Sequence, residues 1–147
     1  MSKPFTEMSF KELASLESGT ILTDGSANGV RYLIMRGPVA LTAYLGVPIG
    51  HPLAGFDYDA IDLDVHGGLT FGGEGDGELL PKGYWWYGWD YGHFKDLNFY
   101  DLKDTPSYKH AEKPWTVKDV QGEIWHATYT FKRLIDLAEK IRGQKEE

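Results

Sequence analysis

The alternation of apolar and polar positions first predicts a short helix near the start of the chain. Its apolar stripe consists of Phe10, Leu13 and Ala14, which have helical spacing. Ser9 and Glu12 have the spacing of a capping box, and Gly19 lies where a helix stop is expected. We therefore expect a helix that begins after Ser9.

The next apolar segments predict a β-hairpin. Val30–Arg36 and Val39–Leu45 read as strands on either side of Gly37-Pro38. Glycine followed by proline suits a two-residue type II′ turn. In the register that this turn sets, Arg31 lies across from Tyr44.

Beyond a loop predicted over 46–59, apolar and polar residues alternate with a period of two. Ile61, Leu63, Val65, Leu69 and Phe71 share one parity, and Asp62, Asp64, His66 and Thr70 share the other. This pattern predicts one strand with a buried face, or two strands bent at Gly67-Gly68. The glycine-rich, acidic residues 72–83 predict an exposed loop.

The segment 84–91 carries bulky aromatic residues on both parities, which is typical of a strand covered on both sides. Tyr84, Trp86 and Asp90 share one face, and Trp85, Tyr87, Trp89 and Tyr91 share the other. Residues 92–114 are polar and predict a long surface loop.

The last part of the chain predicts a weak strand over 115–125 and a strong amphipathic helix over about 127–142. The apolar face of this helix contains Phe131, Leu134, Ile135, Ala138 and Ile141. With no linker or repeat in between, residues 1–147 are expected to form a single α+β domain. Its sheet is mainly antiparallel, with the N-terminal helix and the C-terminal amphipathic helix packed on it.

Composition narrows the classes of function. With no cysteine among 147 residues, the chain has no disulfide, thiolate metal site or cysteine nucleophile. A net charge of -7 argues against a general nucleic-acid partner, which would require a basic face. No apolar run is long enough to cross a membrane and no signal peptide is recognisable, so we expect a cytoplasmic protein without a membrane partner.

Asp90, His93 and Asp96 form the first candidate site. A carboxylate beside a histidine raises the pKa of the histidine and fixes its tautomer, as general acid–base chemistry requires. The simpler alternative is an aspartate that ends a strand, followed by a solvated histidine. We expect neither a bound metal nor a cofactor.

His66-Gly67-Gly68 and the nearby Thr70 form the second candidate. Glycines admit a close backbone approach and positive φ, which suits a ligand site. Alternatively, they only bend the strand away from the acidic residues before them. The segment lacks the spacing of a dinucleotide fingerprint and the Walker lysine.

Aromatic and basic residues extend this hypothesis. Tyr84 and Trp86 share a face with the aspartate that ends their strand, so they are candidates to stack on a base, while the opposite set packs in the core. Arg31 and Arg36 are candidates to bind phosphate, although most strand arginines extend to solvent. His51 could close over the site or only shape a turn.

These motifs together resemble a family of small bacteriophage and bacterial proteins. Its pattern reads Tyr-x-Gly-Val-Pro, His-Pro-Leu, His-Gly-Gly-Leu-Thr-(Phe/Tyr) and Trp-Trp-x-Gly-Phe-Asp-x-x-His-x-x-Asp. The matching segments are 44–48, 51–53, 66–71 and 85–96. Trp89, Tyr91 and Lys95 depart from the pattern, but its histidines and aspartates are all present. The resemblance implies one shared site for His66, Asp90, His93 and Asp96, and it implies no particular reaction.

The phage setting suggests a function by analogy, because several small phage proteins sequester or cleave the nucleotide signals of bacterial immunity. Our leading hypothesis is a binding protein for a cyclic ADP-ribose derivative or a cyclic dinucleotide, acting in the host cytoplasm if phage-encoded. A homo-oligomer is compatible with this hypothesis. One alternative is a hydrolase or lyase in which His66 and His93, with Asp90, supply acid and base. Another is an inhibitor that contacts a host protein directly.

Overall fold

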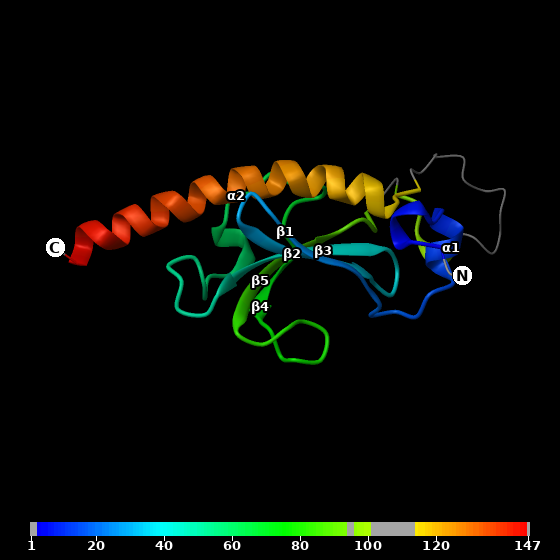
Figure 1. The fold of residues 1–147 in the computed structure, drawn as a ribbon, viewed down its shortest axis with the longest axis horizontal. Helices are drawn as coiled ribbons and strands as arrows, with labels where there is room; N and C mark the ends of the chain where they lie inside the picture. Colours follow the sequence, from blue (N-terminus) through cyan, green and yellow to red (C-terminus); the bar gives the residue numbers. More distant parts are fainter. Residues whose placement is uncertain (1–2, 94–95, 101–113, 147) are drawn as a thin grey trace.

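A computed structural model describes residues 3–93, 96–100 and 114–146 and has the expected α+β fold (Figure 1). Five antiparallel strands form one sheet in the order β1-β2-β3-β5-β4. The strands are β1 (Ile21–Ala27), β2 (Val30–Arg36), β3 (Leu41–Pro48), β4 (Phe71–Glu74) and β5 (Tyr84–Asp90).

Among the described residues, two α-helices accompany the sheet, α1 (Phe10–Ala14) and α2 (Val117–Glu146), together with the short 3-10 helices η1 (Phe5–Glu7) and η2 (Tyr58–Ala60). The predicted capping box of α1 is confirmed, because Ser9 and Glu12 exchange side chain–backbone hydrogen bonds. Helix α2 runs across one face of the sheet, and its C-terminal end projects beyond it (Figure 1). Within the described part of the chain, neither helix could cross a membrane.

The main core lies between the sheet and α2. There Tyr87 and Trp89 of β5 pack in one buried cluster with Ile124 and Phe131 of α2. On the opposite face, a smaller cluster contains Leu33, Met35, Leu80 and Trp86. The expectation that β5 is covered on both sides is therefore confirmed.

The β2–β3 hairpin has a longer turn than the sequence suggested. Gly37 donates its N–H to the carbonyl of Ala40, so four residues separate the strands and Arg36 pairs with Leu41. Arg31 consequently lies across from Gly46, and the predicted pairing with Tyr44 is wrong. Because the shift is two residues, every side chain keeps its expected face.

The predicted strand over 61–71 is also wrong. Only Phe71–Glu74 pairs with a neighbour, and this segment includes glycines that were assigned to an exposed loop. Gly67 and Gly68 have successive φ values of 71° and 78°, which regular β-strand geometry does not allow. Leu63 and Val65 are nevertheless buried, as their parity predicted.

The predicted strand over 115–125 belongs to α2 instead. Thr116 caps the helix, because its N–H donates to the Asp119 carboxylate and its hydroxyl accepts from the Asp119 N–H. The buried positions Val117, Val120, Ile124, Ala127 and Phe131 have regular three- and four-residue spacing. That spacing, continuous with the predicted helix, was the signal that the strand assignment overlooked.

Strand β1 was not predicted. Asn28 and Gly29 join it to β2 with φ values of 52° and 77°, the conformation of a tight hairpin turn. An Asn-Gly pair is a strong hairpin signal. It was missed because the β1 sequence contains Asp24, Gly25 and Ser26, which are poor strand formers.

Candidate functional site

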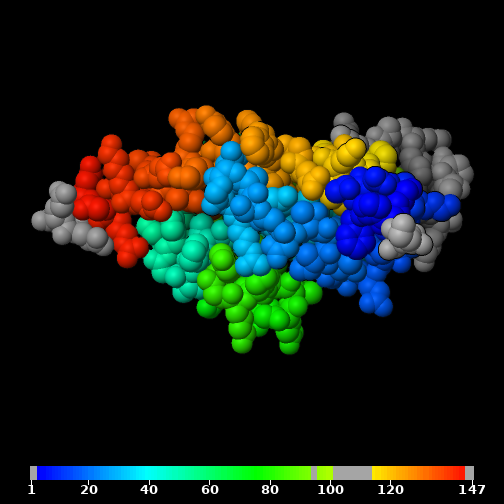
Figure 2. Space-filling view, viewed as in Figure 1, coloured from blue at the N-terminus to red at the C-terminus, as the bar shows by residue number. Residues whose placement is uncertain are grey.

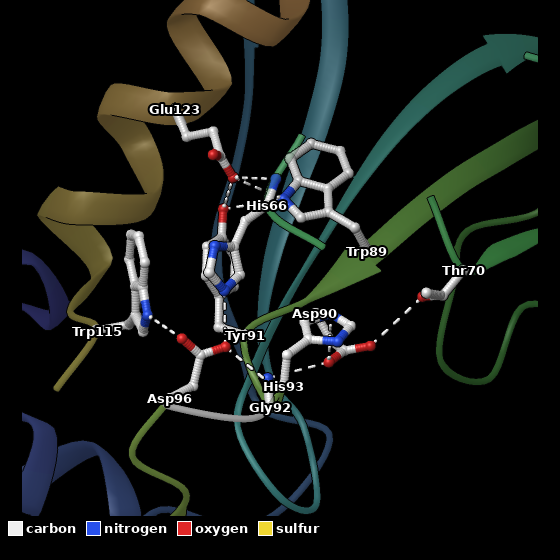
Figure 3. Close-up of polar contacts among 10 residues, drawn as sticks. All are labelled: His66, Thr70, Trp89, Asp90, Tyr91, Gly92, His93, Asp96, Trp115 and Glu123. Atoms are coloured by element: carbon white, nitrogen blue, oxygen red, sulfur yellow. Dashed lines mark hydrogen bonds and ion pairs between the residues drawn. The ribbon is translucent and has the colours of Figure 1, made fainter. Parts of the chain in front are cut away.

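The candidate site begins where β5 ends, at Asp90, whose carboxylate reaches three neighbours (Figure 3). Its Oδ1 accepts from the Gly92 N–H at 3.0 Å and lies 3.4 Å from Nε2 of His93. Its Oδ2 accepts from the Thr70 hydroxyl at 3.4 Å. The side chains of Asp90 and His93 are 37% and 35% exposed, so both are accessible to a ligand. We call Asp90, His93, Thr70 and Thr42, the residue opposite Asp90 on β3, the Asp90 group.

The glycine pair Gly67-Gly68 leaves the space that the His93 ring occupies. A Cβ atom on Gly67 would lie 2.1 Å from Nε2 of His93, so the imidazole occupies the space that any other side chain would fill. Both glycines also have positive φ, which other residues adopt at a cost. The His66-Gly67-Gly68 motif therefore bends the chain and makes room for the second histidine.

His66 lies beside this pair but has a different carboxylate partner. Its Nε2 is 2.6 Å from Oδ2 of Asp96, and that oxygen also accepts from the His93 N–H at 3.0 Å. The other carboxylate oxygen of Asp96 accepts from Nε1 of Trp115 at 2.9 Å. Since the Asp96 side chain is only 6% exposed, these three donors are what make its burial tolerable.

A second carboxylate, that of Glu123 on α2, holds the backbone of His66. Oε1 of Glu123 accepts from the Tyr91 hydroxyl at 2.5 Å, from Nε1 of Trp89 at 3.0 Å and from the His66 N–H at 3.3 Å. Burial and the neighbouring Glu123 raise the pKa of Tyr91 far above its ordinary value. The Tyr91 ring also stacks on His66 at 5.0 Å between centroids. We call His66, Asp96, Tyr91, Trp115 and Glu123 the His66 group (Figure 3).

The two groups adjoin each other, as the sequence predicted for its single site. The imidazole rings of His66 and His93 are 5.6 Å apart and meet edge to face. Asp96 connects them, because its Oδ2 accepts hydrogen bonds from the ring of His66 and from the backbone N–H of His93. Trp115, Glu123 and Thr42 were not predicted as site residues. The first two lie in a segment misread as a strand, and Thr42 has no motif of its own.

A cavity of about 310 Å³ opens beside Asp90, lined by Pro38, Val39, Ala40, Thr42, Asp90 and Gly92. Among the described residues, two buried side-chain polar atoms have no hydrogen-bond partner, Thr42 Oγ1 and His93 Nε2. The 3.4 Å contact from His93 to Asp90 does not have hydrogen-bond geometry. Thr42 is the cross-strand neighbour of Asp90, and the ring of His93 contacts the Asp90 carboxylate. Such atoms are rare in folded proteins and often mark a place for a ligand or an ordered water.

Aromatic side chains continue the same face of the sheet next to Asp90. Tyr44 follows Thr42 along β3 by two positions, and its ring meets that of Phe71 edge to face at 5.9 Å. The Tyr44 ring covers Gly88, where an added Cβ would lie 2.6 Å away. Phe71 is 40% exposed, and the pair lines a separate hollow of about 160 Å³ on this face of the sheet.

Tyr84 and Trp86 do not form the predicted stacking surface. Trp86 is fully buried, its ring covers Gly46, and its Nε1 donates to the carbonyl of Pro81. Tyr84 lies at the opposite end of β5 from Asp90, roughly 20 Å away along an extended strand. Strand parity gave the correct face for both residues but could not show the loop that covers Trp86.

The basic residues also lie elsewhere than predicted. Arg31 forms a two-pronged ion pair with Asp24 and lies over Tyr84, lining a separate hollow of about 560 Å³. Arg36 is buried and donates to the carbonyls of Leu13, Ala14, Gly37 and Pro38. Its guanidinium thereby closes the end of α1 and the β2–β3 turn, and it has no place in the Asp90 cavity.

His51 is likewise remote from the site. Its Nε2 contacts Glu139 in the C-terminal half of α2, and its Nδ1 accepts from the Leu53 N–H. Glu139 is about 24 Å along the helix from Glu123. His51 therefore secures the loop after β3 to α2, and the prediction that it closes over the site is wrong.

Within the described residues, no three or more histidine and carboxylate side chains converge on a point that could hold a metal ion. No protein-family model, curated protein or solved structure matches the chain. The resemblance to small phage proteins therefore stays a prediction.

Proposed function

We propose that this protein binds and sequesters a small nucleotide-like ligand at the Asp90 group. One observation carries the proposal. Thr42, whose buried hydroxyl has no partner, and the partly exposed Asp90 line one cavity of about 310 Å³, and the ring of His93 contacts the Asp90 carboxylate. This volume is at the small end of ligand sites, which is the size of a nucleoside rather than of a whole dinucleotide.

The chemistry of the Asp90 group suits a ribose. A carboxylate accepts hydrogen bonds from two neighbouring hydroxyls, as acidic residues do with the ribose of dinucleotide cofactors. The hydroxyl of Thr42, a residue that lines the cavity, then gains the partner that it lacks. A base next to the sugar would meet Tyr44 and Phe71, and stacking of this kind contributes about 1–3 kcal/mol.

The lining of the cavity also restricts the ligand. Its six lining residues include no cation, so any phosphate groups would extend toward solvent. A vicinal diol is present in derivatives of ADP-ribose but absent from cyclic dinucleotides linked through their 3′ and 5′ oxygens. We therefore favour a cyclic ADP-ribose derivative. Together with the resemblance to phage proteins, this supports a role in removing an immune signal from the host cytoplasm.

A depletion experiment tests the proposal. The protein is incubated with cyclic ADP-ribose, filtered and then heat-denatured, and the released nucleotide is measured by mass spectrometry. We expect depletion of the free ligand and its recovery unchanged. Asp90→Asn should weaken binding by at least about tenfold, the effect of one charged hydrogen bond. The exposed Asp62 provides the control, because Asp62→Asn removes the same charge away from the cavity.

Two comparisons make the test sharper. If the Asp90 carboxylate accepts hydrogen bonds from both ribose hydroxyls, adenosine should compete for the site and 2′-deoxyadenosine should compete far less. If no member of a panel of ribonucleotides is depleted, or if Asp90→Asn binds as well as the parent protein, the proposed function is wrong.

A hydrolase or lyase is the second candidate, favoured by the two adjacent histidine–carboxylate pairs. His93 with Asp90 and His66 with Asp96 place two imidazoles 5.6 Å apart, and Asp90 lines the cavity. Such an arrangement could supply an acid and a base on the same substrate. Recovery of an altered nucleotide from the heat-denatured protein, lost in His93→Gln, would favour this candidate over sequestration.

A further inference from the structure

The outward face of α2 carries two large aromatic side chains that the fold does not use. Trp125 and Tyr129 are 62% and 59% exposed, one turn apart on the side of the helix opposite its buried positions. Figure 2 shows α2, in yellow to red, along one side of the molecule, with the orange part of its outer edge uncovered in this view. Tryptophan and tyrosine are the residues most enriched at the energetic centres of protein interfaces.

Gly122 lies on the same outward face and is equally unexplained by the fold. Glycine is a poor residue for a helix interior. A Cβ atom added to Gly122 would meet nothing within 4 Å, so no contact inside the molecule requires its small size. A glycine in that position lets another chain approach the helix closely.

These residues form one continuous seam with Lys118. The four positions, Lys118, Gly122, Trp125 and Tyr129, are spaced by four, three and four residues, which keeps them on one helical face. The seam is self-complementary when read in opposite directions. In an antiparallel pair of α2 helices, the register that places Trp125 opposite Gly122 also places Tyr129 opposite Lys118.

We propose that this seam is the interface of a homodimer in which the N-terminal halves of two α2 helices pair antiparallel. Trp125 of each copy fills the notch above Gly122 of the other, and each Lys118 ammonium lies against the face of the other copy's Tyr129. The second contact is a cation–π interaction, which relieves the cost of bringing two lysines into an interface. The symmetric arrangement is the commonest one for homodimers.

The exposed area predicts a weak dimer. Aromatic side chains of this size bury about 150–250 Å² each when fully covered. With about 60% of each ring exposed, the four rings of a dimer contribute roughly 400–600 Å². Flanking residues enlarge this area, and the interface falls in the class of weak, transient contacts, below about 1,200 Å². A dimer of this kind forms reversibly and depends on concentration.

Gly122→Ala tests the proposal because it should stabilise the free chain and weaken its dimerisation. In the free chain it should raise the melting temperature, because alanine favours the helix and meets no neighbour. In the dimer the added methyl occupies the space of the partner's Trp125, so the dissociation constant should rise by about tenfold or more. Gly143→Ala is the matched control, since Gly143 is the other glycine of α2 with nothing within 4 Å of its added Cβ and lies beyond the paired segment.

Sedimentation equilibrium of the full chain, from about 10 µM to about 1 mM, measures the association. We expect the parent protein and Gly143→Ala to dimerise equally, and Gly122→Ala and Trp125→Ala to remain largely monomeric. The proposal is overturned if the parent protein is monomeric throughout this range. It is also overturned if the two glycine variants associate equally, or if Trp125→Ala dimerises as well as the parent protein.

Discussion

Removing one hydroxyl group, by Tyr91→Phe, isolates the role of the buried network behind His66. The Tyr91 hydroxyl donates to Glu123 at 2.5 Å and accepts from Nε1 of Trp89 at 2.9 Å. After the substitution, Trp89 still donates to Glu123 at 3.0 Å, so its indole N–H keeps a partner. The carboxylate keeps that donor and the His66 N–H but loses its shortest hydrogen bond.

The expected cost follows from the charge of the acceptor. A hydrogen bond to a charged group contributes about 1.5–3 kcal/mol, and one to a neutral carbonyl about 0.5–1.5 kcal/mol. We expect urea denaturation at pH 7 to show a midpoint lower by about 1 M for Tyr91→Phe, given typical denaturant slopes. Tyr87→Phe is the control, because the Tyr87 hydroxyl donates to the neutral carbonyl of Leu53 at the same distance, 2.5 Å. A loss no larger than that of the control would refute a charged network at Glu123.

The same variant changes the response to alkaline pH. Burial and Glu123 raise the pKa of Tyr91 in the folded protein, whereas in the unfolded chain tyrosine loses its proton near pH 10. The folded state therefore holds a proton that the unfolded state releases. Stability is fully present below about pH 10 and falls above it, by up to about 1.4 kcal/mol per pH unit for each such tyrosine. In Tyr91→Phe the free energy of unfolding should fall less steeply with pH above pH 10, by the contribution of one tyrosine. An unchanged slope would contradict the assignment.

Two further pairs of substitutions separate packing from the site. Leu63→Ala should lower the free energy of unfolding by about 2–5 kcal/mol because Leu63 is buried. His66→Ala should cost less stability and should weaken ligand binding through the lost ring contact with His93, as measured by urea denaturation and the depletion assay. Equal stability losses would make His66 a purely structural residue. Gly67→Ala should displace the His93 ring from a space 2.1 Å from the new methyl and reduce binding, while Gly68→Ala, with nothing within 4 Å, should affect stability through its φ alone. Equal binding by the two glycine variants would contradict the steric role of Gly67.

The sequence predicted those parts of the fold that depend on local periodicity. The capping box of α1, strand β2 and the two covered faces of β5 follow from side-chain spacing within one segment. Strand β4 could not be predicted in this way, because Gly72 and Gly73 have no strand preference and their pairing with β5 is a tertiary effect. The early start of α2 was detectable from the Thr116 cap and was overlooked.

For the site, the sequence grouped the histidines correctly and assigned their partners incompletely. Asp90, His93 and Asp96 are close in the chain, so a turn was enough to bring them together. The carboxylate that supports His66 from α2, Glu123, is far away in sequence and has no motif around it. The arginines were misassigned for a related reason, since Asp24 for Arg31 and the backbone carbonyls for Arg36 are partners that only the folded chain supplies.

The two carboxylates of the site differ in burial, and this difference predicts that ligand binding and stability can be altered separately. Asp90 is 37% exposed, so Asp90→Asn should change the free energy of unfolding by no more than about 0.5 kcal/mol. Asp96 is 6% exposed and accepts from His66, His93 and Trp115. In Asp96→Asn an amide NH₂ group must face one of these donors, and losing a charged hydrogen bond there should cost about 1.5–3 kcal/mol. Because Asp96 also fixes the His93 backbone, this variant should weaken ligand binding as well. Thermal and urea denaturation beside the depletion assay measure both properties, and a stable Asp96→Asn protein with normal binding would show that the His66 group does not support the Asp90 group.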